Sequence, residues 1–264
     1  MKKVLKNNIL IFSLVTLISC DFSSGLHKEI LLAQDYIQEQ EYSKAAEVYE
    51  IILKKKLSPN LRIKITYQLG EIYSIYLNNY KPALKYFKQV VELSDEPLWQ
   101  VKSLEKIAEI NFEYVQDYKE TINAYNVLVN FTPRLQGQDF YNFRIALSNL
   151  NLKNYTVAIE QFNEMIQNQG HEYHIKAFYY VGLSYFYMKN WTKAIDIWYE
   201  YIKREKNRED IVLTKFLIAN AYETNEELKR AYGIYYSILN EYPNPEVVKS
   251  RLESLYARRV SRKR

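Results

Sequence analysis

The sequence contains very little cysteine, glycine or proline, with one cysteine, six glycines and six prolines among 264 residues. A single cysteine cannot form an intramolecular disulfide, which excludes a disulfide framework. The scarcity of glycine and proline leaves few positions for hairpin turns or long linkers. Because 26 tyrosines and 11 phenylalanines can fill a large core, the composition favours an α-helical protein.

Motifs of the common enzyme classes are also missing. The sequence has no glycine-rich phosphate loop, no G-x-S-x-G and no H-E-x-x-H. His171 and His174 lie on either side of Glu172, but no third metal ligand occurs at a useful spacing. We interpret these histidines as satisfied or solvated groups at a turn, and expect no catalytic residues, no metal site and no cofactor.

The first 19 residues have the parts of a secretory signal peptide. Lys2, Lys3 and Lys6 form a positive segment, and a mostly apolar run follows over residues 9–18. That run is only about 10 residues long, whereas a membrane-spanning helix needs about 20. It ends in Leu-Ile-Ser followed by Cys20, which resembles the lipobox of bacterial lipoproteins.

The lipobox resemblance implies that residues 1–19 are removed and that the Cys20 thiol carries a diacyl group with palmitate-type chains. Two or more acyl chains on one residue anchor a protein stably in a membrane. Residues 20–25 are then the lipidated cysteine and a tether. The protein would be an exported lipoprotein on an envelope membrane, at its periplasmic face or at the cell surface. The alternative is a buried free cysteine after an uncleaved helix.

The formal charge of +5 does not indicate a nucleic-acid-binding face. Of the 36 basic residues, three lie in the signal peptide and five in residues 258–264, so the body between them has fewer basic residues than the 31 acidic ones. A nucleic-acid footprint needs a basic face on the body, so we predict no nucleic-acid partner. We interpret the basic tail as a frayed, solvated terminus or, alternatively, as a contact with anionic lipid headgroups.

Six segments share a small or short residue followed four positions later by an aromatic residue, at intervals of 36 to 38 residues. The pairs are Ala45 and Tyr49, Ala83 and Phe87, Thr121 and Tyr125, Ala158 and Phe162, Ala194 and Trp198, and Ala231 and Tyr235. A second series of small residues precedes the first by 12 positions, or by 13 in the second and third units. Its members are Ala33, Gly70, Ala108, Ala146, Gly182 and Ala219, and four of them have a tyrosine three positions later: Tyr36, Tyr73, Tyr185 and Tyr222.

This pattern resembles the tetratricopeptide repeat (TPR), in which each unit is a pair of helices that buries its apolar face against the neighbouring pairs. The resemblance implies an all-α, right-handed α-solenoid of about six helix pairs plus a C-terminal capping helix. The expected units are residues 26–60, 61–97, 98–135, 138–170, 171–208 and 209–243. Residues 244–264 are the capping helix, starting at Pro245 and running through Tyr256, and the basic tail. We expect an extra turn residue in units two and three.

In tetratricopeptide domains the first helix of each unit lines a concave groove. The resemblance therefore implies these partner-binding residues in units four and five: Phe140, Phe143, Leu147, Leu150, Lys176, Tyr179, Leu183, Phe186 and Tyr187. In unit three the groove positions are Lys102, Glu105, Glu109, Phe112 and Glu113. Aromatic groups beside acidic ones predict a protein or peptide ligand with apolar anchors and some positive charge. The alternative is that several of these aromatics belong to the core.

The sequence thus predicts a lipid-anchored, non-catalytic scaffold that binds protein partners at the bacterial cell envelope. A lipobox followed by helical repeats looks like the tetratricopeptide lipoproteins of outer-membrane protein assembly, the BamD-like type. The alternatives are a lipoprotein that coordinates cell-wall synthesis with division, or a surface lipoprotein that contacts a host. An alternative of another class is a glycan-binding protein or an accessory subunit of an envelope enzyme.

Overall fold

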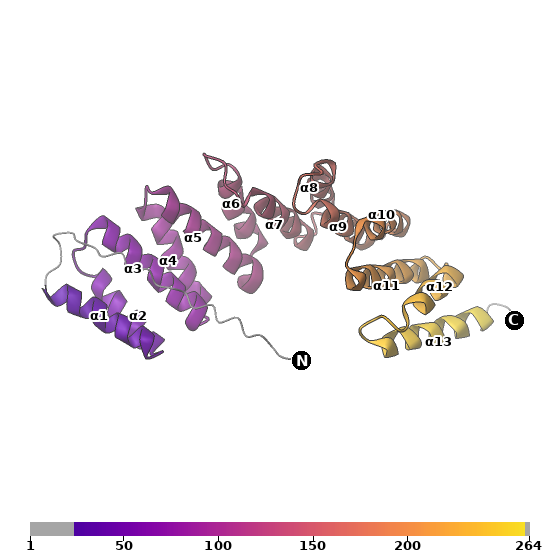
Figure 1. The fold of residues 1–264 in the computed structure, drawn as a ribbon, viewed down its shortest axis with the longest axis horizontal. Coiled ribbons are helices and arrows are strands. Elements are labelled where there is room, and N and C mark those ends of the chain that lie inside the picture. Colours follow the sequence, from indigo (N-terminus) through magenta and orange to yellow (C-terminus); the bar gives the residue numbers. More distant parts are fainter. Residues whose placement is uncertain (1–23, 262–264) are drawn as a thin grey trace. The chain divides into compact units, whose positions relative to one another are not determined.

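The computed structural model describes residues 24–261, and all regular elements in that range are helices (Figure 1). The consecutively packed helices confirm the predicted all-α fold. The predicted signal peptide, Cys20 and residues 262–264 lie outside the described residues. The chain divides into two compact units, Met1–Leu93 and Ser94–Arg264, and each unit is considered by itself.

The described part of the first unit contains two helical hairpins. In chain order, α1 packs against α2, α2 against α3, and α3 against α4. The elements are α1 Ser24–Gln38, α2 Tyr42–Leu53, α3 Pro59–Glu71, a π-helical turn η1 Ile72–Tyr76, and α4 Tyr80–Leu93.

The described part of the second unit contains four more hairpins and a final helix, and every α-helix packs against the next one along the chain. The elements are α5 Pro97–Ile110, a π-helical turn η2 Asn111–Val115, α6 Tyr118–Val129, α7 Gln138–Asn151, α8 Tyr155–Gln167, α9 His174–Tyr187, α10 Trp191–Arg204, α11 Arg208–Thr224, α12 Leu228–Ile238 and α13 Pro245–Ser261.

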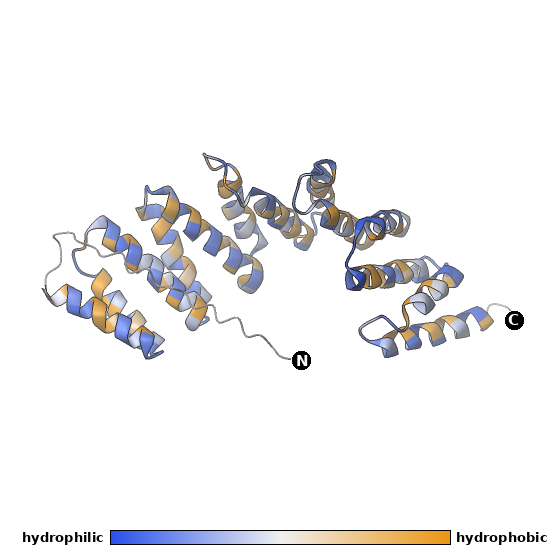
Figure 2. Cartoon of the chain, in the orientation of Figure 1, coloured by the Kyte–Doolittle hydropathy of each residue, from blue (hydrophilic) through white to orange (hydrophobic). Residues whose placement is uncertain are grey.

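Helix starts follow from local sequence chemistry. Pro59, Pro97 and Pro245 open α3, α5 and α13, where the amide that proline lacks has no intrahelical acceptor. Two second helices have side-chain caps: Asp117 Oδ1 accepts from the N–H of Glu120, and Asn190 Oδ1 accepts from the N–H of Lys193. Along these helices, hydrophobic and hydrophilic residues alternate, as Figure 2 shows.

The small and aromatic positions of the repeat meet in the core. A β-carbon added at Gly182 would lie 2.5 Å from the indole of Trp198, and one added at Gly70 would lie 2.7 Å from the ring of Phe87. The missing β-carbon is what lets each ring lie against the neighbouring helix backbone. The six aromatic residues at the repeat position of the second helices are all at most 2% exposed: Tyr49, Phe87, Tyr125, Phe162, Trp198 and Tyr235.

Each hairpin turns through one residue with positive φ, and none of these residues is a glycine. In the α9–α10 turn, Lys189 has φ 60°, and its N–H donates to the carbonyl of Phe186 at 2.9 Å. The next N–H, of Asn190, donates to the carbonyl of Tyr185 at 2.9 Å. This pair of bonds is the Schellman motif, which satisfies carbonyls at the end of a helix. The positive-φ residues are Gln40, Asn78, Gln116, Lys153, Lys189 and Glu226.

The extra residue of units two and three lies inside the first helix rather than in the turn. In those units the first helix ends in the π-helical turns η1 and η2. At η1 the N–H of Leu77 donates to the carbonyl of Ile72, five residues earlier, at 3.1 Å. A π-helical turn accommodates one more residue than an α-helical turn. The prediction of a longer turn was therefore wrong, because the helix absorbs the insertion and the turn keeps its single positive-φ residue.

The last helix packs on the sixth hairpin, with Val248, Leu252 and Leu255 buried against it. It continues to Ser261, beyond the predicted end. Arg258 explains the extension, because its guanidinium binds the carboxylate of Glu223 at 3.0 Å and that of Glu226 at 2.9 Å. The expectation of a frayed basic terminus was thus wrong for residues 258–261.

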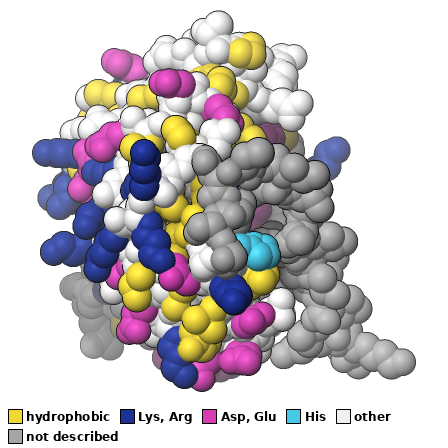
Figure 3. All heavy atoms as spheres, turned by 90° about the vertical axis from the view of Figure 1, so that its left-hand side faces the viewer, with side chains coloured by type: hydrophobic (Ala, Val, Ile, Leu, Met, Phe, Trp, Pro, Cys, Tyr) yellow, Lys and Arg dark blue, Asp and Glu magenta, His cyan; other side chains and the backbone are white. Residues whose placement is uncertain are grey.

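The first hairpin has apolar residues on its surface. Leu31, Leu32 and Ile51 are each more than 40% exposed. The view in Figure 3, toward the α1–α2 side, shows hydrophobic side chains running down this face with lysine and arginine gathered along one side. No helix within the described residues is both long and apolar enough to cross a membrane.

Candidate partner-binding surface

Two of the predicted groove residues lie in the core. Phe143 is 6% exposed and stacks on Tyr173 with ring centroids 4.1 Å apart, while its edges meet Phe162 and Tyr180. Leu150 is also buried. Phe143 belongs on the groove face by register, but its ring fills the gap between the fourth and fifth hairpins. We therefore exclude Phe143 and Leu150 from the binding surface.

Three further aromatic and aliphatic groups of α9 are half-buried by packing. Phe186 lies between Trp191 and Trp198, with ring centroids 4.9 Å and 5.6 Å away. The backbone carbonyl of Tyr179 accepts the indole N–H of Trp198 at 3.0 Å. Leu183 packs against the cores of both the fourth and the fifth hairpins. These side chains consequently stabilise the stack and present only their outer edges.

The fully buried Trp198 is a core residue, as the repeat predicts. Its ring is 0% exposed and its only polar atom donates to a carbonyl. Trp191 covers the α9–α10 turn through its contact with Phe186. The two tryptophans of this hairpin therefore form no binding site.

Tyr187 and Lys176 are the predicted groove residues that α9 exposes. Tyr187 is 52% exposed, and its ring lies 5.9 Å from that of Tyr155 in the preceding hairpin. Met188 follows at the end of the helix and is 43% exposed. This end of α9 thus offers a mixed aromatic and thioether surface of the kind that accepts apolar anchors of a partner.

An arginine that the groove register did not predict lies between the aromatic rings of units three and four. The guanidinium carbon of Arg144 lies 4.2 Å from the ring centroid of Phe112 and 5.0 Å from that of Phe140. Its head group also pairs with Glu113 at 2.8 Å. The signal in the sequence was a basic residue four positions after Phe140, on the same helix face. Leu147, one turn further on, is half-buried against the fourth hairpin's core.

The acidic residues of unit three already have partners within the chain. Glu113 pairs with Arg144, Glu109 with Lys106 at 3.0 Å, and Glu105 accepts the hydroxyl hydrogen of Tyr141. These contacts reduce the negative potential available to a ligand. The expectation of a ligand with some positive charge therefore stays a prediction, beside the exposed apolar groups that offer contacts for its anchors.

Burial keeps the tyrosine hydroxyls near α9 in their neutral form. It raises the pKa of Tyr179 to about 12, with smaller contributions from Tyr180, Tyr187 and Asp210. Burial also raises the pKa of Tyr180, opposed by the positive charge of Arg144. Neutral phenols donate hydrogen bonds, so the surface adds polar but uncharged groups beside Lys176.

Of the two histidines at the start of α9, His171 is buried just before the helix and His174, its first residue, is half-buried. His171 is 8% exposed, and its Nδ1 accepts from the N–H of Tyr173 at 3.1 Å. Nδ1 of His174 lies 3.3 Å from the carbonyl of Met165. Within the described range 24–261, no group of three histidine, cysteine, aspartate or glutamate side chains could hold a metal ion.

Comparison with protein families identifies one of the predicted units. Residues 176–207 match the family model for the tetratricopeptide repeat. That range contains α9 and most of α10, including Gly182, Tyr185, Ala194 and Trp198, on which the resemblance was first based. The fifth helical hairpin is therefore similar to a tetratricopeptide repeat.

Relatives with solved structures share the fold. The C-terminal part of a TPR repeat-containing protein from Cytophaga hutchinsonii is 18% identical, with a TM-score of 0.56 over 86% of this chain and 95% of that one. PilW, described as a widely conserved type IV pilus biogenesis factor, is 16% identical, with a TM-score of 0.53 over 89% of this chain and all of that one. At these identities the likeness shows the fold alone.

A curated relative matches only part of the chain. The human intraflagellar transport protein 88 homolog is 27% identical over 117 residues, which are 44% of this chain and 14% of that protein. This chain therefore corresponds to a small part of that relative. The match carries no statement about the activity of the whole protein.

Proposed function

We propose that this tetratricopeptide-repeat chain is a non-catalytic scaffold that binds protein partners at a bacterial envelope membrane. The observation that carries the proposal is the surface of α9, where Tyr187 is 52% exposed although the other aromatics of the helix are at least half covered. Lys176 and Met188 extend this surface toward both ends of the helix. A large exposed aromatic side chain on a rigid helix is a typical anchor for a partner.

The membrane anchor in this proposal is the lipid on Cys20. The lipobox sequence supports it, and α1 begins at Ser24, so only a few residues separate the anchor from the folded chain. Exposed Leu31 and Leu32 on α1, with the exposed Lys28, suit a position close to a lipid surface. The protein would then be an exported lipoprotein with its first hairpin next to the membrane.

A narrower role in outer-membrane protein assembly follows from the same plan of lipobox and helical repeats. This role remains an analogy at the level of architecture, since one fold serves many functions. A solved protein of the same fold is described as a pilus biogenesis factor, so biogenesis roles occur with this fold elsewhere.

Site-specific crosslinking tests the partner surface. A photoreactive phenylalanine analogue at position 187 should capture a discrete protein in native membranes. The matched control is the same analogue at Tyr236, which is 66% exposed on the second helix α12, and we expect no capture there. Identical products from both positions would refute a surface on α9.

The variant Tyr187→Ala should lose the captured partner while its free energy of unfolding stays within about 0.5 kcal/mol of the parent, as for other exposed positions. A large loss of stability would instead assign Tyr187 to the core.

The anchor is tested separately with Cys20→Ala, which should move the protein from the membrane fraction to the soluble fraction. Retention of this variant in the membrane would contradict lipidation at Cys20.

A further inference from the structure

The first hairpin, formed by α1 and α2, has opposite charges at its two ends. Around the α1–α2 turn, four acidic residues accompany a single lysine: Asp35, Glu39, Glu41, Glu47 and Lys44. At the other end, where α1 begins and α2 stops, lie four lysines, which we call the basic end: Lys28, Lys54, Lys55 and Lys56. An ion pair of 2.5 Å between Nζ of Lys55 and Oε2 of Glu29 joins the start of α1 to the end of α2.

Both acidic residues near the basic end have partners within the chain. Glu29 pairs with Lys55. Oε1 of Glu50 accepts the hydroxyl hydrogens of Tyr73 and Tyr86, at oxygen–oxygen distances of 2.8 Å. Among the described residues, three lysines of the basic end are exposed and form no ion pair: Lys28, Lys54 and Lys56. Their charges are available to an anionic partner outside the chain.

Hydrogen bonds to the main chain hold the lysines after α2 in a defined position. The guanidinium of Arg62 donates to the carbonyls of Leu53 and Lys55 at 2.9 Å each. The N–H of Lys54 donates to the carbonyl of Ile51 at 3.2 Å. Because these bonds fix the backbone before a partner binds, binding loses little backbone entropy.

Apolar side chains adjoin the basic end on both helices. Lys28, Leu31 and Leu32 share one face of α1 by their spacing, and both leucines are 43% exposed. Ile51 and Lys54 share a face at the end of α2, and Ile51 is 52% exposed. We call Leu31, Leu32 and Ile51 the apolar edge. On this side of the first unit, Figure 3 shows hydrophobic side chains next to those of lysine and arginine.

The start of α1 connects the basic end to the proposed lipid anchor. Helix α1 begins at Ser24, four residues after Cys20. A fully extended chain of four residues spans at most about 14 Å. An acyl group on Cys20 would therefore keep the basic end close to the lipid headgroups.

We propose that the basic end and the apolar edge of the first hairpin bind directly to the surface of an anionic phospholipid bilayer. The lysines contact the headgroup phosphates, and the apolar edge enters the boundary between headgroups and acyl chains. The acidic turn lies away from the bilayer, because anionic headgroups repel it. The inference rests on the proposed anchoring at Cys20, which brings the hairpin to the membrane, but folded residues make these contacts.

A fluorescent label on the apolar edge tests this contact. The Cys20→Ala chain has no cysteine, so one introduced cysteine can carry a polarity-sensitive fluorophore. With Ile51→Cys we expect a saturable blue shift on adding phosphatidylglycerol vesicles, and none with phosphatidylcholine vesicles. The matched control is Val127→Cys on α6, because Val127 is 51% exposed. Both chains share residues 1–19, so only the labelled position differs. Equal shifts at both positions, or none at Ile51→Cys, would overturn the proposal.

A pair of charge variants tests the basic end. In the labelled Ile51→Cys chain, Lys54→Gln with Lys56→Gln should bind the phosphatidylglycerol vesicles about 30-fold more weakly, the effect of two lysines at an anionic surface. The control pair, Lys119→Gln with Lys229→Gln, makes the same change in net charge at exposed positions of the second unit, and its binding should be unchanged. Equal weakening by both pairs would mean that net charge, and not the basic end, attracts the chain.

A second copy of the chain is the other occupant that an apolar edge could accept. A blue shift that appears on concentrating the labelled Ile51→Cys chain without vesicles would assign the edge to self-association and overturn the lipid contact.

The anchor and this surface can fail separately. Concentrated salt releases lysine contacts with headgroups, so the release of Cys20→Ala from cell membranes is measured after a salt wash. Release without any vesicle binding would leave the acyl anchor standing and refute the surface on the first hairpin. Vesicle binding by a chain that cells do not acylate would refute the anchor and support the surface.

Discussion

At the scale of single residues, glycine and tryptophan act as a complementary pair. Gly182 has no β-carbon, and the indole of Trp198 occupies the space where one would be, with 2.5 Å between them. Trp198 is fully buried and its N–H is satisfied by a carbonyl. The same complementarity between Gly70 and Phe87 in the first unit shows that it belongs to the repeat.

This pairing predicts that Gly182→Ala destabilises the protein, although alanine is the better helix former by about 1 kcal/mol. The new β-carbon overpacks the core at a cost of about 1–3 kcal/mol, so a net loss should appear in urea unfolding. Gly233→Ala in α12 is the matched control, because its β-carbon would meet nothing within 4 Å, and it should stabilise by about 0.5–1 kcal/mol. Equal gains in both variants would show that Trp198 does not restrict position 182.

At the scale of elements, each hairpin turn contains a residue in a strained backbone conformation that is not a glycine. Six residues with side chains adopt the left-handed conformation, one in each hairpin. That conformation costs an L-residue about 1–2 kcal/mol relative to glycine. The turn geometry persists because the carbonyls at the helix end need the N–H groups that only this conformation directs toward them.

We predict that Lys189→Gly raises the free energy of unfolding by about 1 kcal/mol, since glycine adopts positive φ without strain. Lys189 is exposed, and Lys189→Val should destabilise because a β-branched side chain is the least tolerant of φ near 60°. As a control, Lys85→Gly in the middle of α4 should lower stability by about 0.5–1 kcal/mol. A loss of stability in Lys189→Gly would contradict the left-handed turn.

At the scale of the whole molecule, tyrosines couple stability to alkaline pH. Burial raises the pKa of Tyr49, Tyr73, Tyr179 and Tyr199 to about 12 each. Hydrogen bonds to carboxylates add to this effect at Tyr73, whose hydroxyl donates to Glu50 at 2.8 Å. Burial shifts the pKa of five more tyrosines in the same direction: Tyr86, Tyr125, Tyr141, Tyr201 and Tyr235.

A folded-state pKa above the unfolded value of about 10 means that stability is complete below pH 10. Stability is then lost as pH rises through about 12, because only the unfolded chain can ionise these phenols easily. In an alkaline titration, phenolate absorbance follows the ionisation of tyrosine while circular dichroism follows the helices. The buried tyrosines should ionise together with the loss of helical circular dichroism. A single transition near pH 10 with helices intact would contradict this burial.

The sequence by itself determined the repeat of helix pairs, because small and aromatic residues recur with one period and only stacked hairpins bury both. It also located the start of the last helix at Pro245. It could not place the extra residue of units two and three. An extra residue gives the same spacing in sequence whether it lies in the turn between the helices or in a π-helical turn of the first helix.

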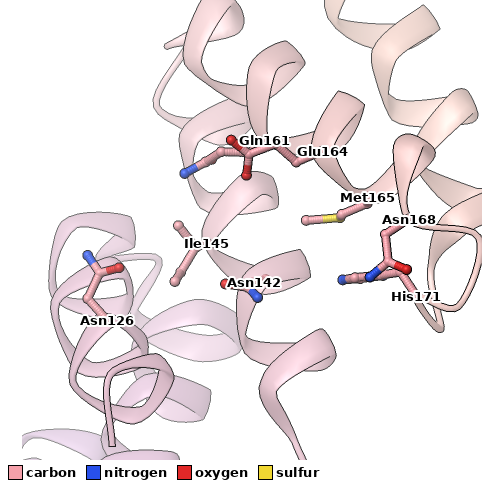
Figure 4. Close-up of a pocket in the computed structure, with 8 residues that line it drawn as sticks. All are labelled: Asn126, Asn142, Ile145, Gln161, Glu164, Met165, Asn168 and His171. Atoms are coloured by element: carbon pink, nitrogen blue, oxygen red, sulfur yellow. The ribbon is translucent and has the colours of Figure 1, made fainter.

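Only the tertiary structure decided which aromatic residues of the groove face solvent. Phe143 and Tyr187 both lie on first helices, but neighbouring hairpins cover one ring and leave the other 52% exposed. A pocket beside α7 likewise combines Asn126, Asn142, Gln161 and His171, which come from separate elements (Figure 4). Helical periodicity reports the face of one helix, whereas exposure and cavities depend on how several helices approach one another.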